Sequence, residues 1–530
     1  MTPGMQFRLW LRTASRVQVG TTLAVMALVV TTVGTSLHVP HGASSASSAP
    51  AEGSTASANA PGVTGATGGP SVSPRVSSSA SPGAGGVVES APASSGGGDS
   101  SQSFGGGFGG SGSTGNSSGG AVDISRASDR GVNPKDCAKP CVKLGFLIAQ
   151  IGGLDASGFA LSLRGDIDKV IDAFVAYQNK HGGILGRQIV AVKRKTDPID
   201  QGDQSTACTS MVKDNKVFGV IDTASLIFAS TQACFTQDNK TPLVHSYAES
   251  DAFQAKAPGY DITETRSLDR IAREWPVEAH SLGFIKGGEK VGILEDNCEP
   301  SAGVVRTVLI PGIKAYKVAS VKVYQSDCSA ADAQAQPPAL QNQMCIDGVT
   351  RVFMATSFVA AQTFLQSADS GPCGNKTNAN HFQYIASDYS LLASDLFTRR
   401  FNKRQWDNSL GITNSYTGLK TQSAQLKFCS KILTDAGLPG LDTSYSNADA
   451  NAICDYFSLF VGISKNVGGN LTRALWAQQA QRLGRFDGAF VPQSIFRPGK
   501  FSGGELVDDI QWHQDCTCYR SMAPLHVGAG

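Results

Sequence analysis

The sequence predicts an α/β protein in which two parallel sheets, each flanked by helices, form two lobes. From residue 142 onward, short apolar runs typical of strands alternate with amphipathic runs typical of helices. This alternation occurs in two successive series of similar size. The chain before residue 137 has no such pattern, which leaves about 390 residues, a length that suits one two-lobed protein.

The strands and helices follow from hydrophobic periodicity. The runs that predict strands are Val142–Ile148, Gln188–Val192, Lys216–Asp222, Thr241–Ser246, Glu289–Asp296, Ser320–Tyr324, Gly348–Met354 and Gln383–Asp388. The runs that predict helices are Asp166–Asn179, Ser205–Asn215, Ile227–Asp238, Ser301–Leu309, Val359–Ala368, Ala450–Asn466 and Thr472–Arg482. The first lobe is expected to pause near Asp261–Arg266, before the second series begins.

The N-terminal residues have the pattern of an export segment. Residues 1–16 carry Arg8, Arg12 and Arg16, and residues 17–37 are apolar and uncharged. A positive region followed by such a run is either a cleaved signal peptide or a transmembrane anchor with residues 1–16 in the cytoplasm. With either alternative, we expect the folded part on the extracellular face of the cell membrane, anchored or secreted.

Residues 38–136 are predicted to form a disordered tether. They consist mainly of Gly, Ser, Ala and Pro, as in Ser77–Pro82 and Phe104–Gly110. Such a segment cannot bury enough apolar surface to offset its chain entropy. The net charge of the whole chain is +2, which gives no reason to expect a nucleic-acid partner.

The cysteines predict disulfides. All twelve lie at or beyond Cys137, and an even number in an exported chain favours disulfide pairing. The two closest pairs, Cys137 with Cys141 and Cys516 with Cys518, have no histidine at a convincing ligand spacing, so we expect no metal and no cofactor. The local pairs that would close modest loops are Cys208–Cys234, Cys298–Cys328, Cys345–Cys373 and Cys429–Cys454.

The segment from His181 to Arg187, His-Gly-Gly-Ile-Leu-Gly-Arg, joins a predicted helix to the strand Gln188–Val192. Its glycine pair can end the helix in a left-handed conformation at little steric cost. The whole unit resembles the first βαβ unit of the type I periplasmic solute-binding proteins, the leucine/isoleucine/valine-binding class. In that family these glycines shape the fold and do not contact the ligand.

The resemblance implies a domain organisation for residues 137–530. The chain would pass between the lobes three times, with residues 137–264 and 415–495 in the first lobe. Residues 265–414 and 496–530 would form the second lobe. The last crossing would add a short C-terminal strand at Asp509–His513.

Polar residues at the carboxyl ends of the predicted strands form the candidate ligand site, since ligands of open parallel sheets bind there. The first series contributes Thr223, Ser225, His245, Ser246, Tyr247, Ala248 and Glu249. The second contributes Glu299, Ser357, Asp388 and Tyr389. Hydroxyl and main-chain N–H groups suit a ligand carboxylate, and acidic side chains suit an ammonium group.

By resemblance, Asp388 stands where the family places the acid that binds a ligand amine, in an open cleft that would leave its carboxylate hydrated. Ser225 and Ala248 stand near the carboxylate-binding positions. Glu249 replaces a usual Thr, and its charge would repel a carboxylate. Ser357 stands where an aromatic residue is common. A polyol, an amide or a cationic solute therefore remains an alternative to an aliphatic amino acid.

The implied function is capture of a small polar molecule for delivery to the permease of an ABC transporter, without catalysis. A ligand-sensing surface receptor is the main alternative. A secreted hydrolase would have to rest on Ser246, His245 and Asp222, because the folded region has no recognisable catalytic motif. An adhesive or scaffold protein with a vestigial cleft is a further alternative.

Overall fold

The computed structural model describes residues 108–109, 140–150, 164–197, 200–223, 228–246, 248–327, 330–374, 381–417 and 422–528. All of them lie within one compact unit, Ser95–Gly530. The predicted export segment, residues 17–37, lies outside the described residues, as does the tether apart from Phe108–Gly109. In the described part of the chain, no helix is both long and apolar enough to cross a membrane.

The first sheet has five parallel strands in the order β3-β2-β4-β5-β6. Its strands are β2 Cys141–Ala149, β3 Gln188–Thr196, β4 Gly219–Asp222, β5 Leu243–His245 and β6 Asp261–Thr263. Four of them confirm the predicted strands. The fifth, β6, lies at the expected pause near Asp261–Arg266 and was not among the predicted strands, because a strand of three residues is too short to show a clear periodicity.

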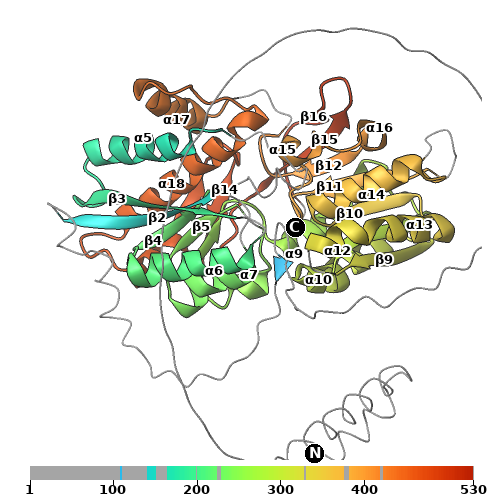
Figure 1. Cartoon of the computed structure of the whole chain (residues 1–530), viewed down its shortest axis with the longest axis horizontal. Helices are drawn as coiled ribbons and strands as arrows, with labels where there is room; N and C mark the ends of the chain where they lie inside the picture. The colour runs from blue at the N-terminus through green and yellow to red at the C-terminus, as the bar shows by residue number, and fades with distance from the viewer. Residues whose placement is uncertain are drawn as a thin grey trace, which may run out of the picture. The chain divides into compact units, whose positions relative to one another are not determined.

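Helices cover both faces of this sheet (Figure 1). One face packs against α5, α17 and α18, where Phe146 of β2 stacks on Phe457 of α18. Residues of α6 and η3 pack on the other face. The helices are α5 Ile167–Lys180, α6 Gln201–Thr209, η2 Ser210–Asp214, α7 Ala229–Ala233, η3 Cys234–Asp238, α8 Asp251–Gln254, α17 Ala424–Asp435, η5 Tyr445–Asn447, α18 Ala448–Asn466 and α19 Arg473–Ala480.

The second sheet is mixed and follows the order β16-β15-β12-β11-β10-β7-β9, with β17 also paired to β15. Strands β7, β9, β10, β11 and β12 are parallel to one another, and β15, β16 and β17 run antiparallel to their neighbours. They are β7 Lys290–Asp296, β9 Ser320–Ser326, β10 Arg351–Ala355, β11 Gln383–Ser387, β12 Leu410–Thr413, β15 Leu506–His513, β16 Cys518–Ser521 and β17 His526–Val527. The predicted C-terminal strand is confirmed as part of β15.

Alternating residues of the second sheet enter two different apolar clusters, as expected for a strand buried on both faces. In β10, Val352 and Met354 pack with α14, whereas Phe353 and Ala355 pack with α9. The helices are α9 Leu268–Ser281, α10 Ser301–Val304, η4 Val305–Leu309, α11 Ile310–Lys314, α12 Ala330–Ala335, α13 Pro337–Asp347, α14 Phe358–Ser370, α15 Asp395–Thr398 and α16 Lys403–Trp406.

The chain passes between the two sheets three times: after β6, after β12 and before β15. The first and last connections run side by side, since the Thr263 N–H donates to the Phe501 carbonyl at 3.1 Å and the Gly503 N–H donates to the Thr263 carbonyl at 2.8 Å. The second connection joins them where the Tyr416 N–H donates to the Phe490 carbonyl at 2.9 Å. The number of crossings matches the prediction, and the lobe boundaries stay a prediction.

Two short pairings lie outside the main sheets. The hairpin of β13 Gly484–Phe486 and β14 Ser494–Phe496 forms the first part of the last connection. The two-residue strand β1 Phe108–Gly109 pairs with β8 Glu299–Pro300, inside the segment predicted to be a disordered tether. The prediction is therefore wrong for these two residues, whose backbone groups pair with a strand that the sequence pattern does not reveal.

The predicted glycine turn is confirmed. Helix α5 ends at Lys180, and Gly182, Gly183 and Gly186 have φ of +95°, +63° and +78°. A Cβ atom at Gly183 would overlap the carbonyl group of Arg187. The turn into β3 therefore needs glycine both for its backbone conformation and for its close approach.

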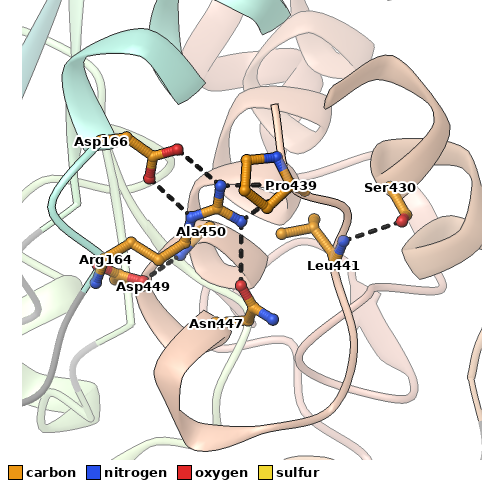
Figure 2. A network of polar contacts seen from close by, with 8 residues as sticks. All are labelled: Arg164, Asp166, Ser430, Pro439, Leu441, Asn447, Asp449 and Ala450. Atoms are coloured by element: carbon orange, nitrogen blue, oxygen red, sulfur yellow. Dashed lines mark hydrogen bonds and ion pairs between the residues drawn. The ribbon is translucent and has the colours of Figure 1, made fainter. Parts of the chain in front are cut away.

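Figure 2 shows how the chain after β12 is fastened to the start of α5. The Arg164 guanidinium donates to both carboxylate oxygens of Asp166 at 2.8 Å. It also donates to the Pro439 carbonyl at 3.2 Å and to Asn447 at 3.0 Å, while the Arg164 N–H donates to Asp449 at 3.2 Å. This network holds the connection between α17 and α18 against the first lobe.

Three of the predicted disulfides are confirmed, namely Cys208–Cys234, Cys345–Cys373 and Cys429–Cys454. Cys516 and Cys518 form another pair. Cys298 is also disulfide-bonded, but its predicted partner Cys328 lies outside the described residues. All described cysteines are therefore oxidised, as the even cysteine count predicts.

Removing the Cys429–Cys454 disulfide by a double serine substitution should lower the free energy of unfolding by about 2–4 kcal/mol, because its loop is long. Its sequence separation is 25 residues, against 2 for Cys516–Cys518. The same substitution at Cys516 and Cys518 is the matched control and should have roughly half that effect. Urea unfolding measures both, and equal losses would contradict the loop-length argument.

Candidate functional site

The carboxyl ends of β4 and β5 hold Thr223 and Ser246 within the first lobe. Thr223 is buried, and its hydroxyl donates to the Leu147 carbonyl at 2.5 Å. Ser246 is also buried, and its carbonyl accepts from the Thr265 hydroxyl at 3.1 Å. Both residues lie at the predicted edge of the sheet, and their hydrogen bonds connect the ends of the strands to the segments that follow.

His245 ends β5 and points into the lobe. Its Nε2 lies 2.7 Å from Oδ1 of Asp261 on β6, and the two side chains are 0% and 1% exposed. Burial lowers the pKa of His245, but Asp261, together with Glu249 and Asp222, raises the pKa above its ordinary value. A ligand cannot reach this imidazole in the present conformation, which removes the hydrolase alternative's only base.

Glu249 has a fully buried side chain, and its carbonyl accepts from the Leu268 N–H at 3.0 Å. Burial, and then the nearby Asp261 carboxylate, raise the pKa of Glu249 to about 8. The group is therefore mainly neutral at pH 7. The expectation that its charge would repel a ligand carboxylate is wrong. The adjacent Ala248 is buried in the apolar cluster that contains Leu268 and Trp275.

In the second lobe, Asp296 at the end of β7 organises the neighbouring strand ends. Its carboxylate accepts from the hydroxyls of Ser326 and Thr356 and from the Ser357 N–H, each at 2.6 Å. The Ser357 hydroxyl accepts from the Ala360 N–H at 3.4 Å and caps the start of α14. Ser357 thus lies at the predicted edge, with its hydroxyl used as a helix cap.

Tyr389 follows β11 but packs inside the second lobe. Its side chain is 1% exposed, and its ring centroid lies 6.1 Å from that of Trp275. The Tyr389 hydroxyl donates to the Ser301 carbonyl at 2.5 Å. The residue supports the lobe in this conformation and does not present its ring to a cleft.

Asp388, immediately after β11, is half-buried and already has partners. Its carboxylate accepts from the Thr413 hydroxyl at 3.0 Å and from the Asn414 N–H at 2.6 Å. Burial raises the pKa of Asp388 to about 7, although these hydrogen bonds and the Arg266 charge act in the opposite direction. The expectation of a freely hydrated carboxylate is therefore wrong, and the role of Asp388 in ligand binding stays a prediction.

The structure places the remaining predicted residues only in part. Ser225 and Tyr247 lie outside the described residues, and for Glu299 only the backbone, in β8, is described. The sequence reasoning missed Thr413 and Asn414, which hold Asp388. They follow β12, a strand of only four residues, and the rule about carboxyl ends would have included them had that strand been recognised.

Two cavities in the described part of the chain are lined by other residues. One, of about 780 Å³, lies against α8, the start of α9 and residues 497–505, and its lining includes Arg270, Arg497 and Lys500. The other, of about 430 Å³, lies at the amino end of the second sheet and is lined by residues such as Phe284 and Gln383. Neither includes a predicted site residue in its lining.

Asp388→Ala should lower the free energy of unfolding of the unliganded protein by about 1–3 kcal/mol, because the Asn414 N–H loses its acceptor. For a ligand with an amine, it should also weaken affinity by about ten- to a hundredfold. Asp435→Ala, which removes an exposed acid paired with Lys431, is the control and should change either quantity little. Urea unfolding and calorimetric titration measure the two effects. Unchanged stability would contradict the contacts of Asp388.

No family model and no curated protein matches this chain. Solved structures do match it. A leucine binding protein from Thermotoga maritima MSB8 has 13% sequence identity and a TM-score of 0.55, over 73% of this chain and 99% of its own. A branched chain amino acid ABC transporter protein from Thermus thermophilus, with bound valine, has 13% identity and a TM-score of 0.55, over 74% and 98%.

A solute binding protein of an ABC transporter from R. palustris, in complex with benzoate, has 15% identity and a TM-score of 0.53, over 73% of this chain and 98% of its own. At these identities the likeness concerns the fold. The matched length agrees with a resemblance that begins near residue 142 and includes both sheets. The chain therefore has the type I periplasmic-binding fold, as the unit around residues 181–187 predicts.

Proposed function

We propose that this protein is an extracytoplasmic solute-binding protein. It captures a small polar molecule, an amino acid or a related compound, between its two lobes and delivers it to the permease of an ABC importer. The observation that carries the proposal is the type I periplasmic-binding fold with polar groups at the carboxyl ends of both sheets. Residues 17–37 would direct it to the extracellular face of the cell membrane, anchored or secreted.

The chemistry of the two sheet edges favours a ligand with a carboxylate. Glu249 is mainly neutral near pH 7, so the first lobe carries no charge there that would repel an anion. Asp388 in the second lobe is the half-buried acid that would bind an ammonium group. An amino acid has a carboxylate for the edge of the first lobe and an ammonium group for Asp388 in the second lobe. An aromatic acid such as the benzoate of the R. palustris protein would interact with the edge of the first lobe alone.

Binding requires no chemical step. A ligand that contacts both lobes favours the closed arrangement through its higher affinity for that state. The three connections between the sheets are the segments whose backbone would change conformation on closure. The buried pairing of His245 with Asp261 further favours binding over hydrolysis, because it keeps the imidazole away from a solute.

A thermal-shift screen of the purified full chain tests the proposal. The panel should contain amino acids, aromatic carboxylates, amides, polyols and sugars. A ligand present at about 100 times its Kd should stabilise the protein by about 2.7 kcal/mol and raise its Tm. The ligand should be recovered chemically unchanged, and its uptake by cells should require this protein. A panel without any stabilising solute, or a hit that is converted to product, would contradict the proposal.

A further inference from the structure

A compact group of ligand-type side chains lies where helix α9 meets the last strands of the chain. Glu274 and Glu278 are one helical turn apart on α9, and His526 lies on β17. One donor atom from each lies within 4.8 Å of the others. Within the group, Nε2 of His526 lies 3.3 Å from Oε1 of Glu278.

Asp509 of β15 faces the same group. Side chains alternate along a strand, so Asp509 shares a face with Val507, which packs against the apolar residues of α9. Residues opposite each other on paired strands share a face, and Val507 is opposite His526. Asp509 accordingly interacts electrostatically with Glu278, His526 and Glu274.

The Asp509 side chain has a buried carboxylate oxygen without a hydrogen-bond partner in the described part of the chain. Asp509 is 6% exposed, and its Oδ1 has no hydrogen-bond partner among the residues that the structure describes. Leaving a carboxylate oxygen buried without a partner is unfavourable by several kcal/mol when the group is ionised. This oxygen therefore needs a cation or a proton.

The charges around the group do not balance. Glu274, Glu278 and Asp509 are all buried acids. Arg266 forms a buried ion pair with Glu274, and Ser281 donates to Glu278 at 3.0 Å. On the far side of β15, Asp508 accepts from the Ser521 hydroxyl at 2.6 Å and adds further negative charge. His526, 3.3 Å from Glu278, is a further group there that can carry positive charge.

We propose that Glu274, Glu278, Asp509 and His526 bind a divalent transition-metal ion of the Zn²⁺ type. One imidazole nitrogen and two carboxylate oxygens, from His526, Glu274 and Glu278, lie within 4.8 Å of one another. Asp509, which is outside this trio, would complete the set as a fourth ligand, and one nitrogen with three oxygens suits Zn²⁺. Ca²⁺ prefers six to eight oxygen ligands and suits the imidazole poorly. The ion would fasten β17, at the end of the chain, to β15 and α9.

The sequence did not suggest this site because its ligands are far apart. Glu278 and His526 are separated by 248 positions, and the expectation of no metal considered close Cys and His spacings alone. The pairing of β15 with β17 brings the histidine to the helix. The site is independent of the proposed solute binding, so either can fail without the other.

Calorimetric titration of the untagged full chain, treated with chelator and then with zinc chloride at pH 7.5, tests the site. We expect saturable binding of one equivalent, and a higher Tm with zinc than without it. Glu278→Gln and Asp509→Asn keep the side-chain volume and should each weaken zinc binding by at least about tenfold. His513→Ala removes an imidazole of β15 that is not part of the site, and this variant should bind zinc as the wild type does.

Chelator-treated variants should keep the unfolding transition of the chelator-treated wild type, which separates a lost ligand from a lost fold. If one variant does not fold, the other gives the same comparison. Calcium chloride should bind more weakly than zinc chloride. The site is overturned if the wild type shows no saturable zinc binding, if Asp509→Asn and Glu278→Gln bind zinc as the wild type does, or if calcium binds more tightly.

Discussion

Glu249→Gln should stabilise the protein at pH 9 by about 3–5 kcal/mol and at pH 5 by less than about 1 kcal/mol. Burial raises the pKa of Glu249 from 4.5 to about 8 in the folded protein. The folded state therefore keeps a proton that the unfolded state releases, and wild-type stability falls as the pH rises from about 4.5 through about 8. Glutamine has a similar shape and no charge to bury.

Urea unfolding at pH 5, 7 and 9 measures this effect. The buried acids that lie away from Glu249 are common to both proteins, so their contributions to the pH dependence cancel in the comparison. Asp214→Asn is the matched control, because Asp214 is an exposed acid of the first lobe. Its stability should run parallel to that of the wild type. A constant difference between Glu249→Gln and the wild type at all three pH values would show that Glu249 titrates normally.

Asp455→Ala should lower the free energy of unfolding by about 3–5 kcal/mol. Asp455, on α18, is fully buried and accepts from the backbone N–H groups of the last connection. Those distances are 2.6 Å from Ala489, 2.7 Å from Phe490 and 3.4 Å from Val491. Alanine would leave these groups without their acceptor and would loosen the segment that leads to β15.

Asp455 also interacts with a residue of the first connection, Glu264. Glu264 lies on the first connection, and burial together with the Asp455 charge raises its pKa well above the ordinary value. Asp455 thus lies where the first and last connections approach α18. Asp487→Ala, in the same loop but exposed and paired with Arg485, is the control and should change stability by less than about 1 kcal/mol. Similar losses in the two variants would contradict the role given to Asp455.

The long strands could be predicted from the sequence because they are continuous apolar runs. β2 and β7 are buried on both faces, so their hydrophobic character is visible without knowledge of the sheet. The strands β6 and β12 have three and four residues and give too little periodicity. The helix α9 went unrecognised as well, although its amphipathic pattern is clear once its place against the second sheet is known.

The candidate site could be predicted in position but not in chemical state. Thr223, His245 and Asp388 all lie at strand ends, as the topology requires. Whether such a group is free depends on partners from strands that the sequence did not reveal. Asp261 of β6 holds His245, and Thr413 of β12 holds Asp388. The neutral state of Glu249 likewise arises from burial in three dimensions, which no local pattern reports.

Hydrogen exchange of the full chain, with and without the tightest solute from the screen, tests the central claim most directly. Binding between the lobes should slow exchange at the carboxyl edges of both sheets, around Thr223 and residues 245–250 and around residues 356–357 and 388–390. The three connections should also exchange more slowly in the closed state. Slower exchange confined to one lobe, or to the residues that line the 780 Å³ cavity, would contradict capture between the lobes.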